Sequence, residues 1–253
     1  MISLPIQKTK EQNFSLVRFF NLSNLILMRT YISLVIFFIL LLFSKAYSHV
    51  QHYKDLNFLK YGLYFNDKLI GNHTFKFEQK GELLHVYGSG NFNVKKLGVT
   101  LFDFKTASEE VFKKGRLIKY TSKTLQNEKE KFSNVKIENN KLLIDGSSFK
   151  GEAEVDLLVG TWWNHEIIKF SKQISPISGR LLPQKVIFVG KKNIKINNKS
   201  YKTLHFYFSS DDELPVDKKK LNINIFYDEK SLLWVKSSYK KFGEWEYRLL
   251  EAK

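Results

Sequence analysis

The sequence predicts a mainly β protein whose strands form an antiparallel meander. Aromatic residues make up 15% of the 253 residues, with 12 Tyr and 22 Phe against 4 Pro, and aromatic rings suit the half-buried surface of a sheet. After residue 60, short runs of alternating apolar and polar residues follow one another with turn residues between them, which is typical of antiparallel strands. No strand pattern is followed by a long helical one, which argues against a parallel α/β fold.

The first strands follow from this alternation. Residues 73–78 place two phenylalanines on one face and Lys76 and Glu78 on the other, which is the two-residue period of a strand. Glycines interrupt a later strand, and we expect a bulge or sharp bend at residues 88–90. Strands are predicted at 61–65, 69–71, 73–78, 84–87, 99–107, 109–112, 117–125, 131–138 and 142–144, with turns at 66–67, 81, 114–115 and 139–140.

The second half repeats the pattern. Leu204, Phe206 and Phe208 share one face of a predicted strand, while His205 and Tyr207 share the other. Hairpin turns are expected at 197–198 and 229–230, the first because Asn tolerates positive φ. Strands are predicted at 185–189, 194–196, 201–208, 221–227, 232–239 and 245–250.

One segment interrupts the strands. Residues 155–173 carry apolar side chains at mixed spacing, and we predict a short helix or a packed loop there. No linker divides residues 61–253, so we expect a single antiparallel β domain, preceded by a linker at 49–60. The apolar positions of the interruption are Leu157, Leu158, Trp162, Trp163, Ile167 and Ile168.

Residues 1–48 are predicted as an N-terminal extension with a secretory signal. An uncharged apolar stretch at 31–43 follows Arg29, and Ala46 and Ser48 suit the −3 and −1 positions of a cleavage site. The stretch is short for a spanning helix, and Met28 is the expected true start. We therefore expect an exported, periplasmic protein. The alternative is that residues 22–43 stay attached as an anchor in the inner membrane, with the β domain outside the cytoplasm.

Composition limits the chemistry. The chain has no cysteine, and its only methionines are Met1 and Met28, so disulfides, thiol nucleophiles and a lipidated cysteine are excluded. The net charge is +16, but lysines appear scattered between acidic residues and arginines are few. This pattern argues against nucleic acid as a partner, and we expect membrane contact through the N-terminal segment alone.

Several short motifs follow one another along residues 61–253. They are Tyr64, Asp67 and Ile70-Gly71; Val99-Thr100-Leu101-Phe102 before Glu110 and Gly115-Arg116-Leu117; Thr161-Trp162-Trp163-Asn164; and Tyr227-Asp228 before Trp234. Taken in this order, the motifs resemble a family of exported bacterial proteins of unknown function. The resemblance implies a layout similar to the lipoprotein-carrier type of fold: a single strongly curved antiparallel sheet, as a half-barrel or incomplete barrel, with a small helical plug.

Trp162, Trp163, Asn164 and His165 form the most distinctive cluster. One hypothesis makes them a lid or wall over an apolar ligand, with Asn164 and His165 supplying polar contacts. The other makes the tryptophans core anchors that plug the sheet. Adjacent side chains diverge, so both tryptophans cannot line one pocket equally.

Other chemistry is weakly indicated. If His49 becomes the mature N-terminus, it and His52 could chelate copper; otherwise no metal site and no cofactor are expected. The remaining histidines lack ligand spacing. Glu109 and Glu110 are adjacent in a predicted strand and should point to opposite faces. They are therefore not expected to act together as a catalytic pair of carboxylates. Nucleophile and phosphate-binding motifs do not occur in the sequence.

Three functions stay open. We expect a non-catalytic envelope protein that binds a lipid, an acyl chain or an unfolded segment on its curved sheet. The alternatives are an envelope hydrolase that uses Glu110 or His165, and a structural or interaction module that pairs exposed sheet edges with partners. An empty interior near Trp162 and Trp163 would favour the first function. A filled interior would leave surface interactions, and a long unpaired edge would favour the module.

Overall fold

The computed structural model describes residue 53 and residues 55–96, 98–210, 213–215 and 218–253. These residues fall within one unit, Ser48–Lys253. The predicted signal, His49 and His52 lie outside the described residues. Within the described part of the chain, no helix has the length and apolar character needed to cross a membrane.

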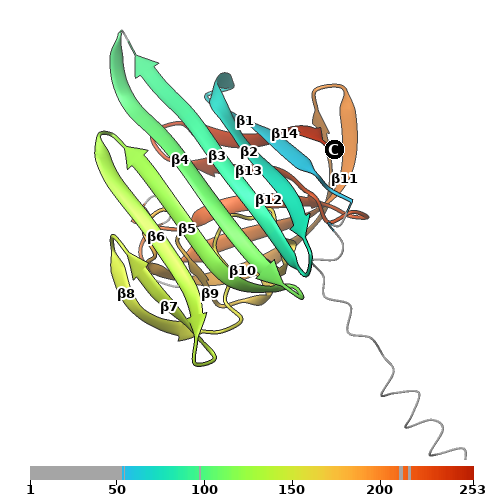
Figure 1. The fold of residues 1–253 in the computed structure, drawn as a ribbon. Coiled ribbons are helices and arrows are strands. Elements are labelled where there is room, and N and C mark those ends of the chain that lie inside the picture. Colours follow the sequence, from blue (N-terminus) through green and yellow to red (C-terminus); the bar gives the residue numbers. More distant parts are fainter. Residues whose placement is uncertain (1–52, 54, 97, 211–212, 216–217) are drawn as a thin grey trace, which may run out of the picture. The chain divides into compact units, whose positions relative to one another are not determined.

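Fourteen strands of the described residues form one antiparallel sheet (Figure 1). The order is β8-β7-β6-β5-β4-β3-β2-β1-β14-β13-β12-β11-β10-β9, and the two edges do not pair. This confirms the predicted incomplete barrel. The strands are β1 Phe58–Phe65, β2 Lys68–Lys80, β3 Leu83–Lys96, β4 Val99–Lys113, β5 Arg116–Gln126, β6 Lys129–Glu138, β7 Lys141–Gly146, β8 Phe149–Glu154, β9 Lys172–Ile174, β10 Leu181–Ile196, β11 Lys199–Ser210, β12 Asn222–Asp228, β13 Trp234–Lys240 and β14 Glu244–Ala252.

The first and last strands meet in the middle of the sheet. β1 pairs with β2 on one side and with β14 on the other, and the Lys253 N–H donates to the Phe58 carbonyl at 2.9 Å. β1 begins within the range assigned to the linker. Joining the two ends of the domain in this way makes both halves of the sheet depend on the central pair.

The sheet is strongly curved, as aromatic contacts show. The rings of Phe102 on β4 and Trp245 on β14 lie 5.7 Å apart, although three strands separate β4 from β14 in the sheet. Such a contact requires the sheet to fold over on itself. Both rings belong to a small aromatic cluster with Leu63, Phe92 and Phe104.

The tight turns follow the predicted chemistry. Asn66 and Asp67 have φ of 47° and 64°, and Asn139 and Asn140 have φ of 49° and 58°. Two successive positive φ values are the requirement of the hairpin turn whose twist matches the strands. Asn and Asp accept this conformation more readily than other non-glycine residues.

Three details of the strand prediction were wrong or incomplete. The bulge expected at residues 88–90 does not occur: β3 stays in register with both neighbours there, and its register with β4 shifts between Val94 and Lys95. Gly88 serves close packing instead, since a Cβ there would lie 2.4 Å from Ser108 Oγ. β8 and β9 were missed. β10 is one strand with a register shift between Phe188 and Gly190.

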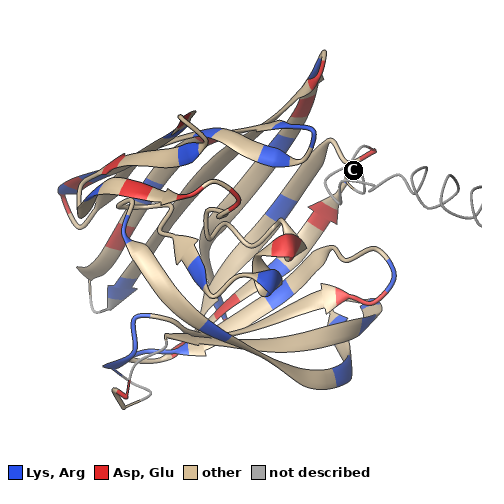
Figure 2. Cartoon of the chain, turned by 90° about the horizontal axis from the view of Figure 1, so that it is seen from below, with Lys and Arg blue, Asp and Glu red and all other residues tan. Residues whose placement is uncertain are grey.

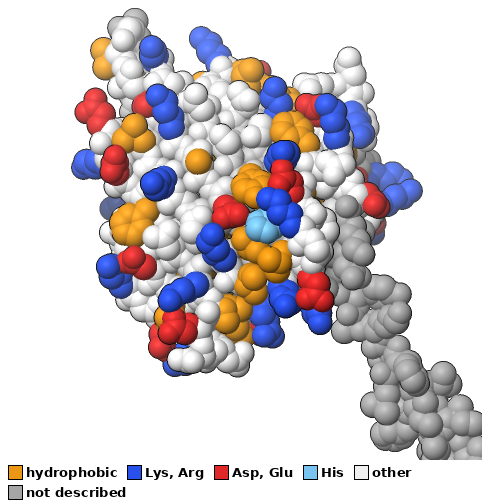
Figure 3. Space-filling model, in the orientation of Figure 1, with side chains coloured by type: hydrophobic (Ala, Val, Ile, Leu, Met, Phe, Trp, Pro, Cys, Tyr) orange, Lys and Arg blue, Asp and Glu red, His pale blue; other side chains and the backbone are white. Residues whose placement is uncertain are grey.

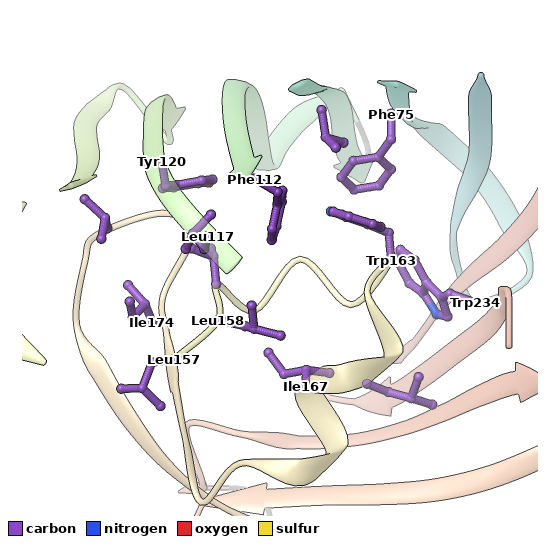
Figure 4. Close-up of a cluster of buried hydrophobic side chains, with 14 of the residues drawn as sticks. Phe75, Phe112, Leu117, Tyr120, Leu157, Leu158, Trp163, Ile167, Ile174 and Trp234 are labelled. Carbon is purple, nitrogen blue, oxygen red and sulfur yellow. The ribbon is translucent and has the colours of Figure 1, made fainter. Parts of the chain in front are cut away.

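The segment between β8 and β9 fills the interior, which confirms the short helix or packed loop. It contains one 3-10 helix, η2 (His165–Lys169). Its Trp163 lies among Phe75, Phe112 and Trp234 of the sheet (Figure 4). Residues from both halves of the sheet join the segment in a single buried cluster, so the concave side is packed around this plug.

The outer face of β2–β8 is mixed in character. Charged side chains of both signs and scattered hydrophobic side chains cover it (Figure 3), and both signs recur along the ribbon (Figure 2). Opposite charges across neighbouring strands pair locally, as in Lys141 with Glu152 and Lys150 with Asp145. Part of the charge on this face is therefore compensated locally.

Candidate functional site

The predicted cluster lies on the plug rather than over an opening. Trp163 has 0% exposure, while Asn164 and His165 have 5% and 4%. Trp162 has a φ of 61°, a left-handed conformation that is uncommon for a bulky residue, and its carbonyl accepts from the Tyr227 hydroxyl at 3.0 Å. The polar side chains of the cluster are thus held within the protein.

The two tryptophans have different neighbours, as expected for adjacent side chains that point in different directions. Trp163 makes edge contacts with the rings of Tyr53, Phe77 and Phe112 at 5.1–5.5 Å. Trp162 packs against Trp234 at 5.9 Å. Edge-to-face contacts of this kind add to the energy of burial, so Trp163 anchors the plug to the sheet.

Glu110 is the most unusual group in this region. It is 2% exposed, and Trp163 Nε1–H donates to its Oε1 at 2.7 Å. Burial raises the pKa of Glu110 to about 7, although hydrogen bonds from Trp163 and Thr161 partly lower it. A carboxyl group without a cation among its partners holds its proton more strongly in a medium that solvates charge poorly.

The neighbouring Glu109 points the other way, as expected from strand geometry. It contacts His85 at 3.0 Å and Lys119 at 3.1 Å, and these partners, His85 foremost, lower the pKa of Glu109. The two acids therefore cannot act together on one substrate. The pair instead consists of one exterior ion-paired group and one interior hydrogen-bonded group.

His165 has different hydrogen-bond partners from Glu110. Its Nδ1 hydrogen-bonds with the Tyr53 hydroxyl at 2.8 Å, and its Nε2 lies 3.2 Å from Glu166. Asn164 caps η2 by accepting from the Glu166 N–H at 3.1 Å. An indole N–H donates but does not accept, so Trp163 cannot pass a proton between Glu110 and His165. This geometry gives the hydrolase hypothesis little support.

The other histidines are placed individually. His85 contacts Glu109, and His205 Nε2 donates to Asn224 at 2.8 Å. His73 faces the interior beside Phe75, and burial lowers its pKa to about 4. Nowhere in the described ranges do three potential metal-ligating side chains gather.

A groove of about 680 Å³ lies on the outer face of β5–β8. None of the four predicted residues lines it. Its charged residues already have partners: Lys119 contacts Glu109 and Lys136 contacts Glu138. Its lining includes Lys119, Thr121, Asn134, Lys136, Leu143, Asp145, Gly151 and Glu152.

The long strand β10 forms an open edge that the sequence reasoning missed. β9 pairs only with Leu181–Pro183, and the Gln184 N–H donates to the Ser171 carbonyl at 2.7 Å. From residue 185 to 196, the described residues give β10 a strand partner on the β11 side alone. A row of backbone groups along the other side is therefore available to another strand.

The same strand exposes apolar side chains and lysines. Ile187, Phe188 and Val189 are 43%, 54% and 55% exposed, at the point where the register with β11 shifts. Residues 181–210 contain six lysines and no Asp or Glu. The view that lysines are scattered between acids therefore fails for this hairpin, and this run was the sequence signal that could have revealed it.

Residues 61–250 match the model of a family described as a domain of unknown function, DUF6134. Comparison with proteins of curated function gives no match. Among solved structures, the beta-barrel-like protein of domain of unknown function DUF1849 from Brucella abortus is similar, with a TM-score of 0.53 and 10% identity over 78% of this chain and 97% of that one.

These matches bear on fold and family. At 10% identity the solved structure shows the barrel-like fold alone. The family model spans more than half of the chain and includes every strand from β2 to β13. The predicted resemblance to a family of unknown function with a curved sheet is thereby confirmed. The chain belongs to the DUF6134 family of domains of unknown function.

Proposed function

We propose that this chain is an exported, non-catalytic envelope protein whose β domain is an interaction module. In this proposal the open edge of β10 pairs with an extended segment of a partner polypeptide. One observation carries the proposal: residues 185–196 of β10 have a strand partner on one side only within the described part of the chain. Strand addition to such an edge is a recurrent mode of peptide recognition.

Two further observations support surface binding over interior binding. The plug occupies the concave side, and its Trp163 and Ile167 are at most 1% exposed. Natural sheets protect long edges by short strands, prolines, lysines, bulges or coverage. β10 carries lysines and a register shift, but it has 16 residues, and residues 185–196 have no second strand partner within the described part of the chain. The edge of β10 is therefore open over 12 residues, which is long enough to pair with a strand of a partner.

The test uses the full chain and a displayed library of random nine-residue peptides. Peptides selected on the wild-type chain should lose binding to Val189→Pro, because proline removes an amide and obstructs an approaching strand. Val189 has no partner in the β10–β11 register, so the ladder of the domain itself should survive. Val189→Thr keeps the amide and a similar shape, and serves as the matched control.

Loss of binding in Val189→Pro with retention in Val189→Thr supports edge pairing. Equal binding to both variants by every selected peptide contradicts it. Far-ultraviolet circular dichroism and the melting temperature show whether Val189→Pro retains the fold. If it does not, Ile187→Asp probes the same edge without a change in the backbone.

A second candidate function is the binding of an apolar ligand that carries a hydrogen-bond acceptor. The binding residues would be Trp162, Trp163, Asn164 and His165. It is favoured by Trp162 Nε1, Asn164 Nδ2 and Trp234 Nε1, which are buried donors with no partner among the described residues. Buried donors normally have an acceptor. A lipid or fatty acid seen by native mass spectrometry, and lost in Trp162→Phe, would support this function; displacement of a fluorescent fatty acid should agree. A protein that carries no such mass and binds no such probe would contradict it.

Export is proposed from the apolar stretch at 31–43 and the small residues Ala46 and Ser48. Mapping the N-terminus of the mature protein tests it. We expect His49 as the first residue of a periplasmic protein. Peptides from upstream of Ser44 in the exported protein would contradict cleavage and support the inner-membrane anchor.

A further inference from the structure

We infer that the segment that pairs with β10 is acidic, with apolar residues facing one half of the edge and Asp or Glu facing the other. This inference rests on the proposed function, because it names the partner of the same edge. It is carried by the charge of the β10–β11 hairpin and by the way that charge is left uncompensated.

The hairpin concentrates positive charge. Its 30 residues, 181–210, contain six lysines and no acidic residue, whereas the rest of residues 55–253 contains 29 Lys and Arg against 24 Asp and Glu. An acidic run does follow, at 211–213, but it comes after the strand that carries the lysines. The charge of the domain is therefore unevenly distributed along the chain.

Most of these lysines have no ionic partner in the described part of the chain. Lys191 contacts Glu229, and Lys199 lies over the ring of Tyr201 at 5.0 Å. No ion pair among the described residues engages the others or Lys199. The lysines without one are Lys185, Lys192, Lys195, Lys199 and Lys202.

The lysines and the apolar residues divide the edge into two halves. Ile187, Phe188 and Val189 occupy the half nearer to β9, and Lys191, Lys192 and Lys195 occupy the half nearer to the hairpin turn. Lys191 stands opposite Leu204 and Lys192 opposite Thr203, so successive lysines project to opposite faces of the sheet. A strand added at the usual spacing of about 4.8 Å could place acids near lysines on both faces.

Other occupants fit less well. A second copy would bring six lysines against six, and like charges directly opposite each other destabilise a strand pair. Residues 1–48 carry five Lys and Arg against one Glu, so the N-terminal segment is also repelled. Lipid headgroups and nucleic-acid phosphates offer acceptors but not the alternating donors and acceptors that a strand edge requires.

The experiment compares three labelled peptides of about nine residues, near the upper end of the usual range of strand lengths. They share alternating Val and Thr in one half and differ only at three positions in the other, which hold Glu, Gln or Lys. Binding to the full chain is measured by fluorescence anisotropy. We expect the Glu peptide to bind about tenfold more tightly than the Gln peptide, as the sum of several weak exposed ion pairs. The advantage should shrink as salt rises from about 50 to 500 mM.

Charge variants locate the effect. Replacing Lys191, Lys192 and Lys195, the lysines of the half nearer to the hairpin turn, by Gln should reduce the affinity for the Glu peptide to that for the Gln peptide. Replacing three lysines on β4–β6 by Gln removes the same charge elsewhere and should change little. These control positions are Lys105, Lys123 and Lys129.

The outcomes distinguish the inference from the function on which it rests. Equal affinities for the Glu and Gln peptides, both abolished by Val189→Pro, overturn the acidic partner and leave edge pairing intact. Failure of all three peptides, together with failure of the peptide library, overturns the proposed function itself. Tighter binding of anionic vesicles or of an oligonucleotide of equal charge, without a preference for peptide, overturns the choice of a polypeptide.

Discussion

Replacing Glu110 by Gln should make the domain more stable at neutral pH than the wild type. The buried carboxyl group has its pKa raised from 4.5 to about 7 by burial, whereas in the unfolded chain it ionises near 4.5. Below pH 4.5 both states hold the proton. Between pH 4.5 and 7 the unfolded state alone releases it and is favoured, so the contribution of Glu110 to wild-type stability falls as pH rises through this window.

The magnitude follows from the size of this change. At 1.36 kcal/mol per pH unit, a pKa raised from 4.5 to about 7 corresponds to about 3 kcal/mol of stability. Gln keeps an acceptor for the Trp163 Nε1–H and cannot ionise. The free energy of unfolding of Glu110→Gln should therefore gain about 3 kcal/mol on that of the wild type between pH 4.5 and 7.5.

Urea unfolding followed by tryptophan fluorescence at four pH values between 4.5 and 7.5 provides the assay. Subtracting wild type from variant at each pH cancels the other titrating groups. Glu109→Gln is the matched control, because partners lower the pKa of that exterior acid and its titration affects stability at and below pH 4.5; the difference between this control and the wild type should stay nearly constant from about pH 5.5 to 7.5. A difference for Glu110→Gln that stays flat across the range would refute the reasoning.

Three further predictions concern the plug and the interior. Trp163→Ala should cost about 3–5 kcal/mol in urea unfolding, since Trp163 is fully buried and bonded to Glu110; a loss well under 1 kcal/mol would show that it is not an anchor. Gly146→Ala should destabilise by roughly 1–3 kcal/mol, because its Cβ would lie 2.4 Å from the Ser178 carbonyl in the connection between β9 and β10; an unchanged melting temperature would contradict this. Between pH 6.5 and 4 the unfolded state binds a proton that the folded state does not, because burial lowers the pKa of His73 to about 4; His73→Gln should therefore gain stability relative to the wild type as pH falls through this window. A difference between His73→Gln and the wild type that stays flat across this window would contradict the prediction.

The fold was predictable because its determinants are local. Two-residue alternation and Asn-rich turns are visible in any single strand, and Asn66, Asp67, Asn139 and Asn140 adopt the positive φ values that such turns require. β8 and β9 escaped prediction because they are short and weakly alternating. Gly88 and Gly90 led to the wrong prediction of a bulge. In the sequence, a glycine that leaves room for the side chain of a neighbouring strand cannot be told apart from a glycine that bends its own strand.

The site was less predictable because it depends on contacts between distant residues. The bond from Trp163 to Glu110 joins positions 53 residues apart, and nothing local indicates it. The divergence of Glu109 and Glu110 followed from strand geometry alone. The open edge of β10 depends on how few residues of β9 pair with it, whereas the lysine-rich composition of the hairpin was visible in the sequence from the start.

Hydrogen–deuterium exchange along β10, measured with and without the Glu peptide, tests the central claim most directly. If an extended segment pairs with the edge, amides within residues 185–196 that face away from β11 should exchange more slowly in the complex, because they gain carbonyl partners. Amides of β4 should be unaffected. Slower exchange elsewhere with β10 unchanged, under conditions where the peptide is bound, would contradict pairing at this edge.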